Sequence, residues 1–172
     1  MATTHHYQAR CTWTGSTGAG YEAYDRRHRA EAPPAVAALE LASDPAFRGD
    51  PSLLNPEQLL VLAASSCQLL SFLAVASRAR LDVVAYEDDA MAEMTESHGP
   101  ASLSRIVLRP RITLAGPVDE ARLRHLVEVA HRQCYIANSL KTSVEVDATF
   151  VEAFSNPGSG TGLDEFGGQP AS

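Results

Sequence analysis

The feature that most constrains this chain is a long stretch without formal charge. Residues 59–76 contain no charged side chain over 18 positions, which approaches the length that a helix needs to cross a bilayer. Four polar residues interrupt the stretch, namely Ser65, Ser66, Gln68 and Ser71, and its flanks show no positive-inside asymmetry. We therefore interpret it as a core helix or a seam between subunits, and expect no membrane span.

The start of this helix is marked by the sequence Asn-Pro-Glu-Gln at residues 55–58. Asparagine is a favoured N-cap, proline suits the first helical position, and the carboxylate of Glu57 complements the positive end of the helix dipole. Arg78 and Arg80 mark the opposite end, where positive charge is favoured. The sequence predicts one helix from residue 56 to residue 80.

Segments with the two-residue periodicity of strands lie on both sides of this helix. We expect strands within residues 6–14, 21–32, 36–41, 83–96, 103–115 and 144–150, with a turn at 97–100. The segment 103–115 has apolar residues of one parity at Ile106, Leu108, Ile112 and Leu114. Pro110 cannot donate a ladder hydrogen bond, so we expect an edge position or a bulge there.

A second helix is predicted from residue 119. Its apolar stripe contains Leu123, Leu126, Val127 and Ala130. Cys134 continues the stripe if the helix persists, because it lies close to three turns beyond Leu123. The order of strands, long helix, strands, helix and strand predicts an α+β fold, with a single domain over residues 1–154. Residues 155–172 are rich in Gly, Ser and Pro and are expected to form a flexible tail.

Charge and cysteine content exclude several classes of function. The net charge is -7, from 14 basic and 21 acidic side chains, and without a basic patch we expect no nucleic-acid partner. The first residues show no basic region followed by an apolar core, as a secretory signal would have, and three cysteines do not suggest a disulfide framework. We therefore expect a cytoplasmic protein with reduced thiols. No nucleotide or metal motif is present, so we expect no cofactor and no metal site.

Both predicted helices carry a cysteine in an apolar face, at Cys67 and Cys134. Periodicity alone favours inert, buried thiols. The sequence NPEQLLVLAASSCQLL, however, resembles the hallmark helix of the OsmC/Ohr family (osmotically inducible protein C and organic hydroperoxide resistance protein), in which the cysteine follows the glutamate by ten residues. His131, Cys134 and Asn138 match a second family pattern, H-x-x-C-x-x-x-N.

This resemblance implies a fold, an assembly and an activity. The fold would have curved antiparallel sheets around two long central helices, in an intertwined homodimer. The activity would be that of an organic hydroperoxide reductase, a thiol peroxidase of the oxidative stress response. Cys67 would form a sulfenic acid, and Cys134 would convert it to a Cys67–Cys134 disulfide. A thiol such as a dihydrolipoyl group would return the reducing equivalents.

A peroxidatic cysteine must react as a thiolate, and burial disfavours that charged form. A positive group beside it is therefore needed, with a carboxylate to orient that group. Glu57 matches the carboxylate of the family, but ten residues on an unbroken helix span about 15 Å. Either the helix is broken, or Glu57 serves Cys67 of a partner chain. The second alternative predicts composite active sites in a homodimer.

The activating arginine departs from the family pattern, because the Gly-Arg-Asp-Gly turn of well-studied members is absent. Arg26 is favoured by its early position in the chain, and Arg48 by its place in the loop that leads into the long helix. Gln68 and Tyr135 also differ from the commonest family residues and bear on the shape of the pocket. Cys11 is expected to be structural.

Two other functions remain open at this point. The missing turn favours an OsmC-like protein that has weak or lost peroxidase activity and instead binds a small hydrophobic ligand or senses redox state. A thiol-dependent hydrolase or redox sensor that uses Cys67 alone would form no disulfide with Cys134.

Overall fold

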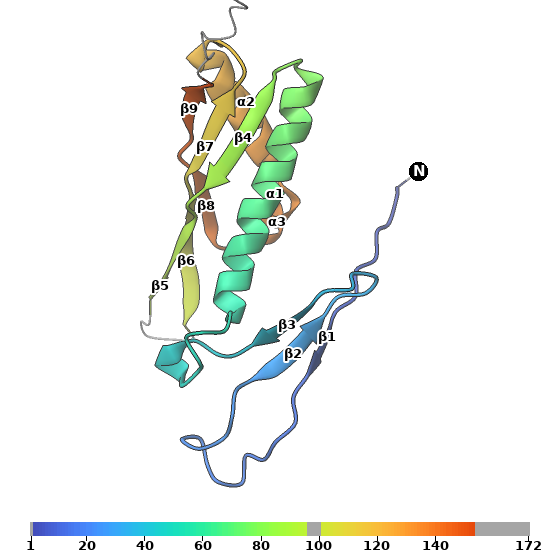
Figure 1. The fold of residues 1–172 in the computed structure, drawn as a ribbon, viewed down its shortest axis with the longest axis vertical. Coiled ribbons are helices and arrows are strands. Elements are labelled where there is room, and N and C mark those ends of the chain that lie inside the picture. The colour runs from blue at the N-terminus through green and yellow to red at the C-terminus, as the bar shows by residue number, and fades with distance from the viewer. Residues whose placement is uncertain (1, 96–100, 154–172) are drawn as a thin grey trace, which may run out of the picture.

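The computed structural model describes residues 2–95 and 101–153 (Figure 1). The predicted turn at 97–100 and the predicted tail at 155–172 lie outside the described residues. The described elements, with a 3-10 helix at Pro45–Phe47, are β1 (Arg10–Thr12), β2 (His28–Glu31), β3 (Ala38–Leu41), α1 (Pro56–Arg78), β4 (Val83–Asp88), β5 (Met91–Thr95), β6 (Ser102–Leu108), β7 (Pro110–Leu114), α2 (Glu120–Arg132), α3 (Tyr135–Ser139), β8 (Ser143–Val146) and β9 (Thr149–Glu152). The predicted α+β class is confirmed.

Helix α1 begins with the predicted capping residues. The Asn55 side chain accepts a hydrogen bond from the Gln58 amide at 2.8 Å, and the Gln58 side chain accepts one from the Asn55 amide at 3.1 Å. The helix runs unbroken to Arg78. Its length and composition would suffice for a membrane span, but Phe72 and Val75 pack into the core against α2 and the sheet.

Two three-stranded sheets follow one another along α1, in the orders β4-β7-β9 and β5-β6-β8 (Figure 1). The chain passes between the two sheets three times, from β4 to β5, from β6 to β7 and from β8 to β9. The segments predicted as single strands at 83–96, 103–115 and 144–150 are therefore each divided in two. Together the sheets form one strongly bent layer against the long helix.

The position of Pro110 corrects a prediction. It lies in the central strand β7, not at a sheet edge, and it is fully buried. Pro110 is the first residue of β7, where β6 ends and the layer bends. A missing N–H is tolerated at the first residue of a strand.

The family resemblance implies antiparallel sheets. The two sheets along α1 instead contain both antiparallel and parallel strand pairs. Strand β8 pairs with β6 in parallel, and β9 pairs with β7 in parallel. Helices α2 and α3 lie between β7 and β8 in the chain. This helical crossover brings the chain back to the end of the layer where β6 begins, so that β8 and β9 can run parallel to β6 and β7.

The core lies between α1, α2 and the bent layer. The predicted one-parity residues of β6 and β7 are all buried, at Ile106, Leu108, Ile112 and Leu114. In α2, Leu123, Val127 and Ala130 are also buried, which confirms the predicted stripe. Phe72 of α1 packs against Tyr86 of β4, with ring centroids 6.1 Å apart.

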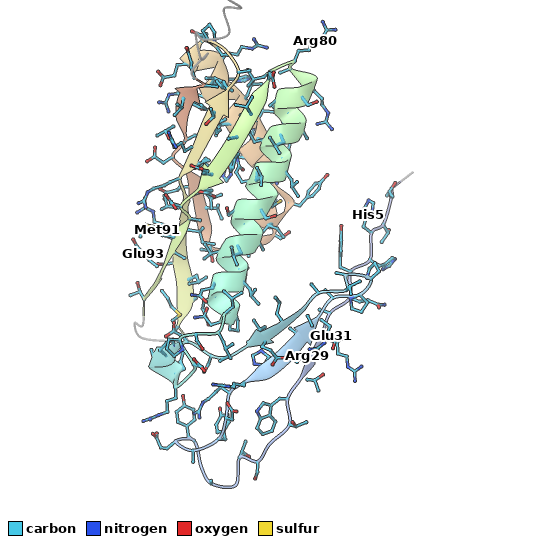
Figure 2. All side chains as sticks on the ribbon, viewed as in Figure 1. His5, Arg29, Glu31, Arg80, Met91 and Glu93 are labelled. Carbon is cyan, nitrogen blue, oxygen red and sulfur yellow. The ribbon has the colours of Figure 1, made fainter. Side chains whose placement is uncertain are left out.

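The N-terminal strands form a separate antiparallel sheet, β1-β2-β3, beyond the N-terminal end of α1 (Figure 1). Of the segment predicted at 21–32, only His28–Glu31 is a strand, because residues 21–24 form a turn. Arg29 pairs with Glu31 at 2.8 Å on the open surface of this sheet (Figure 2). Cys11 is exposed on the edge strand β1. Within the described residues, no helix covers either face of this sheet.

Candidate functional site

Cys67 lies near the middle of α1 and is partly exposed. Its sulfur accepts a hydrogen bond from the backbone amide of Ile136 at 3.5 Å. Ile136 belongs to the first turn of α3, whose free amides carry partial positive charge. This contact gives a developing thiolate on Cys67 one backbone donor.

Cys134 lies in the break between α2 and α3, not on a continued α2 as the periodicity predicts. Helix α2 ends at Arg132, and the Cys134 backbone is extended, with φ -72 and ψ 107. The thiol is nevertheless fully buried, as the apolar stripe predicts. The helix ends two residues before the cysteine.

The two sulfurs lie close enough to interact. The pKa of the Cys134 thiol is raised to about 11, mainly by burial and also by its hydrogen bond with Cys67, while the Ala137 and Ile136 amides act in the opposite direction. Both cysteines are free thiols. The pair thus combines a partly exposed sulfur with a buried one that stays protonated at neutral pH.

A cavity of about 790 Å³ opens beside Cys67. Its lining is largely apolar, with residues from α1, from α3 and from the N-terminal segment: Tyr7, Ala63, Ser66, Leu70, Ser71, Ala74, Arg78, Gln133, Tyr135, Ile136 and Ser139. The α1 members recur at three- and four-residue intervals and so share one helix face. Arg78 supplies the cation at the end of this face.

Glu57 does not reach this cavity. It lines a different cavity of about 490 Å³ near the start of α1, with Ser65, Asp88 and Met91 among the other lining residues. One of its carboxylate oxygens is buried and has no hydrogen-bond partner within the described part of the chain. Because α1 is unbroken, the broken-helix alternative is excluded, and ten residues of helix separate Glu57 from Cys67 by about 15 Å.

Arg26 is held among aromatic rings in the N-terminal segment. Its guanidinium donates to the carbonyl oxygens of Tyr21 and Tyr24 and lies 3.8 Å from the ring centroid of Tyr24. Its cavity of about 320 Å³ is lined also by Trp13 and His28. Cys67 is not among the lining residues, so within one chain Arg26 and the nucleophile lie apart.

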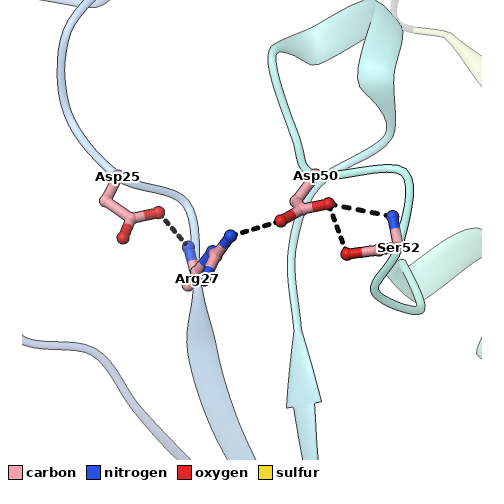
Figure 3. Close-up of polar contacts among 4 residues, drawn as sticks. All are labelled: Asp25, Arg27, Asp50 and Ser52. Atoms are coloured by element: carbon pink, nitrogen blue, oxygen red, sulfur yellow. Dashed lines mark hydrogen bonds and ion pairs between the residues drawn. The ribbon is translucent and has the colours of Figure 1, made fainter.

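The neighbouring Arg27 ties this segment to the loop before α1 (Figure 3). Its guanidinium pairs with Asp50, whose other carboxylate oxygen accepts hydrogen bonds from the Ser52 amide at 2.9 Å and hydroxyl at 2.6 Å. These hydrogen bonds from Ser52, with the charge of Arg27, lower the pKa of Asp50. The turn that carries Arg26 is thereby fixed relative to the start of α1.

Arg48, the second candidate arginine, pairs with the Glu22 carboxylate. It caps the short 3-10 helix in a left-handed conformation, with φ 65. The next residue must be glycine, because a Cβ at Gly49 would lie 1.5 Å from the Ser43 carbonyl oxygen. Arg48 thus belongs to a tight, ion-paired loop and does not line the Cys67 cavity.

The structure adds two groups that the sequence analysis missed. The backbone amide of Ile136 has no side-chain signal and could not be found from sequence. Arg78 could have been found, because it follows Cys67 by eleven residues, close to three helical turns. Among residues 2–95 and 101–153, no three His, Cys, Asp or Glu side chains gather closely enough to hold a metal ion.

Comparisons with known proteins identify the family and the fold of the chain. The family model described as OsmC-like protein matches residues 49–149. An OsmC-like protein of unknown function from Vibrio cholerae superposes with a TM-score of 0.76 at 27% identity, over 85% of this chain and 100% of that one. No curated protein sequence matches the chain.

Two more distant structures share the fold. An organic hydroperoxide resistance protein from Elizabethkingia anophelis, with thiocyanate bound, has a TM-score of 0.67 and 21% identity, over 89% of this chain and 100% of that one. An organic hydroperoxide resistance protein from Legionella pneumophila has a TM-score of 0.63 and 16% identity, over 87% of this chain and 99% of that one.

Proposed function

The chain belongs to the OsmC-like protein family, and from this premise we propose that it is a thiol-dependent peroxidase that reduces organic hydroperoxides. The observation that carries the proposal is the pairing of a partly exposed Cys67 with a fully buried Cys134 beside one cavity. Such a pair suits a nucleophile that is accessible to the substrate and a second thiol that is buried next to it.

The reaction proceeds in two steps. The Cys67 thiolate attacks one peroxide oxygen, the O–O bond breaks, and the alkoxide leaves as an alcohol after taking a proton. Cys67 is then a sulfenic acid. The Cys134 sulfur attacks the Cys67 sulfur, the S–O bond breaks, and the released hydroxide takes the thiol proton and leaves as water. A thiol or dihydrolipoyl reductant restores the two thiols in the cytoplasm.

The cavity favours an organic substrate over hydrogen peroxide. Leu70, Ala74 and Ile136 line it with apolar carbon, which binds an alkyl or aryl group through the hydrophobic effect. Hydrogen peroxide has no such group and would gain nothing from this lining.

The active form is a homodimer with composite sites. Leu62 and Leu70 on α1 are 53% and 64% exposed, and an apolar helix face of this kind is commonly covered by a partner. Glu57 and Arg26 lie in cavities that do not contain Cys67. We assign them to the Cys67 of the partner chain, with Arg26 as the activating cation and Glu57 as the carboxylate that orients it. Arg48 is the alternative cation.

One observation favours the alternative function, a binder of small hydrophobic molecules that lacks peroxidase activity. Within the described residues of a single chain, the only cation that lines the Cys67 cavity is Arg78, three helical turns away. If no partner supplies a nearer cation, the cavity remains but the thiolate is not stabilised. The two functions differ in whether peroxide consumes the thiols.

The test adds one equivalent of cumene hydroperoxide to reduced protein and maps the thiols by mass spectrometry. The proposal expects rapid loss of two thiols and a Cys67–Cys134 disulfide. The Cys134→Ser variant should stop at a Cys67 sulfenic acid that dimedone traps. Consumption of peroxide no faster than by Cys67→Ser would refute the peroxidase and leave the hydrophobic-ligand binder.

A further inference from the structure

We propose that Asn138 is a positioning residue, which holds Cys134 in line with Cys67 for the disulfide-forming step. This inference rests on the proposed function. It assigns a task to the last residue of the H-x-x-C-x-x-x-N pattern, which contacts neither sulfur in the structure.

The side chain of Asn138 closes the segment around Cys134 into a loop. Its amide nitrogen donates to the carbonyl oxygen of Arg132 at 3.0 Å, and its backbone N–H donates to the carbonyl oxygen of Cys134 at 3.0 Å. Arg132 is the last residue of α2, so its carbonyl has no partner within that helix. Asn138 therefore links the end of α2 to α3, with Cys134 between them.

Cys134 itself is held by backbone hydrogen bonds, from its N–H to the His131 carbonyl at 3.1 Å and from the Asn138 N–H to its own carbonyl at 3.0 Å. It occupies the N-cap position of α3, but its side chain makes no capping hydrogen bond. In the part of the chain that the structure describes, the Asn138–Arg132 contact is the only side-chain hydrogen bond between α2 and α3. Without it, the segment from α2 to α3 would be held by backbone hydrogen bonds alone, and we expect the Cys134 sulfur to be positioned less precisely relative to Cys67.

The same loop also determines the environment of Cys67. The Ile136 amide, which donates to the Cys67 sulfur at 3.5 Å, lies inside the segment that Asn138 closes. In the resolution step the Cys134 sulfur must approach the Cys67 sulfur opposite the departing oxygen. A displacement of about 1 Å at such a reacting centre can slow a reaction by orders of magnitude.

The test compares Asn138→Ala and the nearly isosteric Asn138→Asp, which lacks the amide donor, with a matched control, Thr142→Val. The Thr142 hydroxyl donates to the Leu103 carbonyl at 2.9 Å, so this control removes a similar hydrogen bond just after α3 and away from the sulfurs. Asn138 is exposed, so its loss should leave the fold intact.

Two rates are measured on reduced protein: oxidation of Cys67 by cumene hydroperoxide, and closure of the disulfide. Both Asn138 variants should close the disulfide about ten-fold more slowly, and their oxidation of Cys67 should slow by less than that. Dimedone-trapped sulfenic acid and, with excess peroxide, sulfinic acid should accumulate. Thr142→Val should match wild type in both steps. Wild-type closure in both Asn138 variants would overturn the inference.

Closure driven by diamide separates this inference from the proposed function. Cys67 adds to the N=N bond of diamide, and Cys134 then displaces the hydrazine to form the disulfide, so no peroxide is required. If wild-type protein ignores peroxide, the peroxidase proposal fails. Slower diamide closure in the Asn138 variants would still support the positioning role, and equal closure would refute it.

Discussion

At the scale of single residues, burial divides the tasks of the two cysteines. Cys134 is 0% exposed, and burial is the main cause that raises the pKa of its thiol to about 11, well above neutral pH. Cys67 is partly exposed and faces the cavity. Since a thiolate is the reactive form, the exposed sulfur is the one suited to meet a peroxide.

The buried Cys134 should leave a signature in the dependence of stability on pH. Its pKa rises from 9.0 to about 11, so between these values the native state holds a proton that the unfolded state has lost. The unfolded state then binds fewer protons, and the free energy of unfolding falls as pH rises, by at most about 1.4 kcal/mol per pH unit. Urea denaturation from pH 8 to 10.5 measures this slope.

The matched variant for this measurement is Cys134→Ala, which lacks the titrating thiol. Its overall stability will be lower because of the cavity that it creates, but its slope above pH 9 should be shallower than that of wild type. Parallel slopes in the two proteins would show that Cys134 does not titrate in this way.

Gln68 is a second residue whose burial has a measurable consequence. It is 1% exposed, and its side-chain oxygen has no hydrogen-bond partner among the described residues. Replacement by methionine, of similar length, should raise the free energy of unfolding by about 1 kcal/mol, because an unsatisfied polar group is removed. Urea denaturation tests this. The exposed Gln8→Met should change little, and a destabilised Gln68→Met would contradict the account.

The residue identities of the candidate site could be predicted in part from the sequence. The prediction rested on two spacings, that of Glu57 and Cys67 and that of His131, Cys134 and Asn138. Such spacings are available without a structure, because side-chain chemistry is read directly from the sequence. The Ile136 amide could not be predicted, since backbone groups differ only through their conformation. Cys11 was expected to be structural, and the structure places it, exposed, on an edge strand. Its exposure could not be predicted, because no apolar periodicity in the N-terminal strands indicates which face of their sheet is buried.

At the scale of elements, one carboxylate joins the long helix to the layer of strands. Asp88, the last residue of β4, accepts hydrogen bonds from the Ser65 hydroxyl of α1 at 2.5 Å and from the Arg109 amide at 2.6 Å. Arg109 is the residue between β6 and β7. Asp88 therefore joins the long helix to the point where two strands change sheets.

Removal of this carboxylate should be costly. Asp88→Ala should lower the free energy of unfolding by about 2 to 3 kcal/mol, since it leaves a backbone amide and a hydroxyl without their charged acceptor. Ser65→Ala removes only one of the two contacts and should cost about 1 kcal/mol. Thermal or urea unfolding gives both values. Equal, small losses would mean that Asp88 contributes no more to stability than Ser65 does.

Elements were predictable where their signals are local. The capping residues at 55–58 gave the start of α1, and the apolar spacing gave the buried face of α2. The strand breaks were not predictable, because the alternation of apolar residues continues unchanged through Pro110 and through residues 147–148. The breaks coincide with contacts between distant segments, such as the hydrogen bond from the Asp147 amide to the Leu108 carbonyl at 2.8 Å.

At the scale of the whole molecule, the N-terminal sheet lacks a covering layer within the described chain (Figure 1). A three-stranded sheet needs packing on one face to be stable, and Trp13, Val36 and Leu39 remain exposed on this part of the chain. A second subunit would cover it and the apolar face of α1. The protein should therefore have a molar mass in solution that is twice that of the 18.4 kDa chain. Light scattering measures this directly, and a stable monomer would contradict it.

We propose that the Cys67 of one subunit works with the Glu57 of the other, and subunit complementation distinguishes this arrangement from a site built within one chain. Cys67→Ser and Glu57→Gln homodimers should each reduce cumene hydroperoxide very slowly. A heterodimer with one subunit of each kind, purified through two different tags, would contain one complete site and one doubly defective site. The account predicts about half of the wild-type rate for this heterodimer. A heterodimer as inactive as both parents would contradict it, because each site would then require both residues from the same chain.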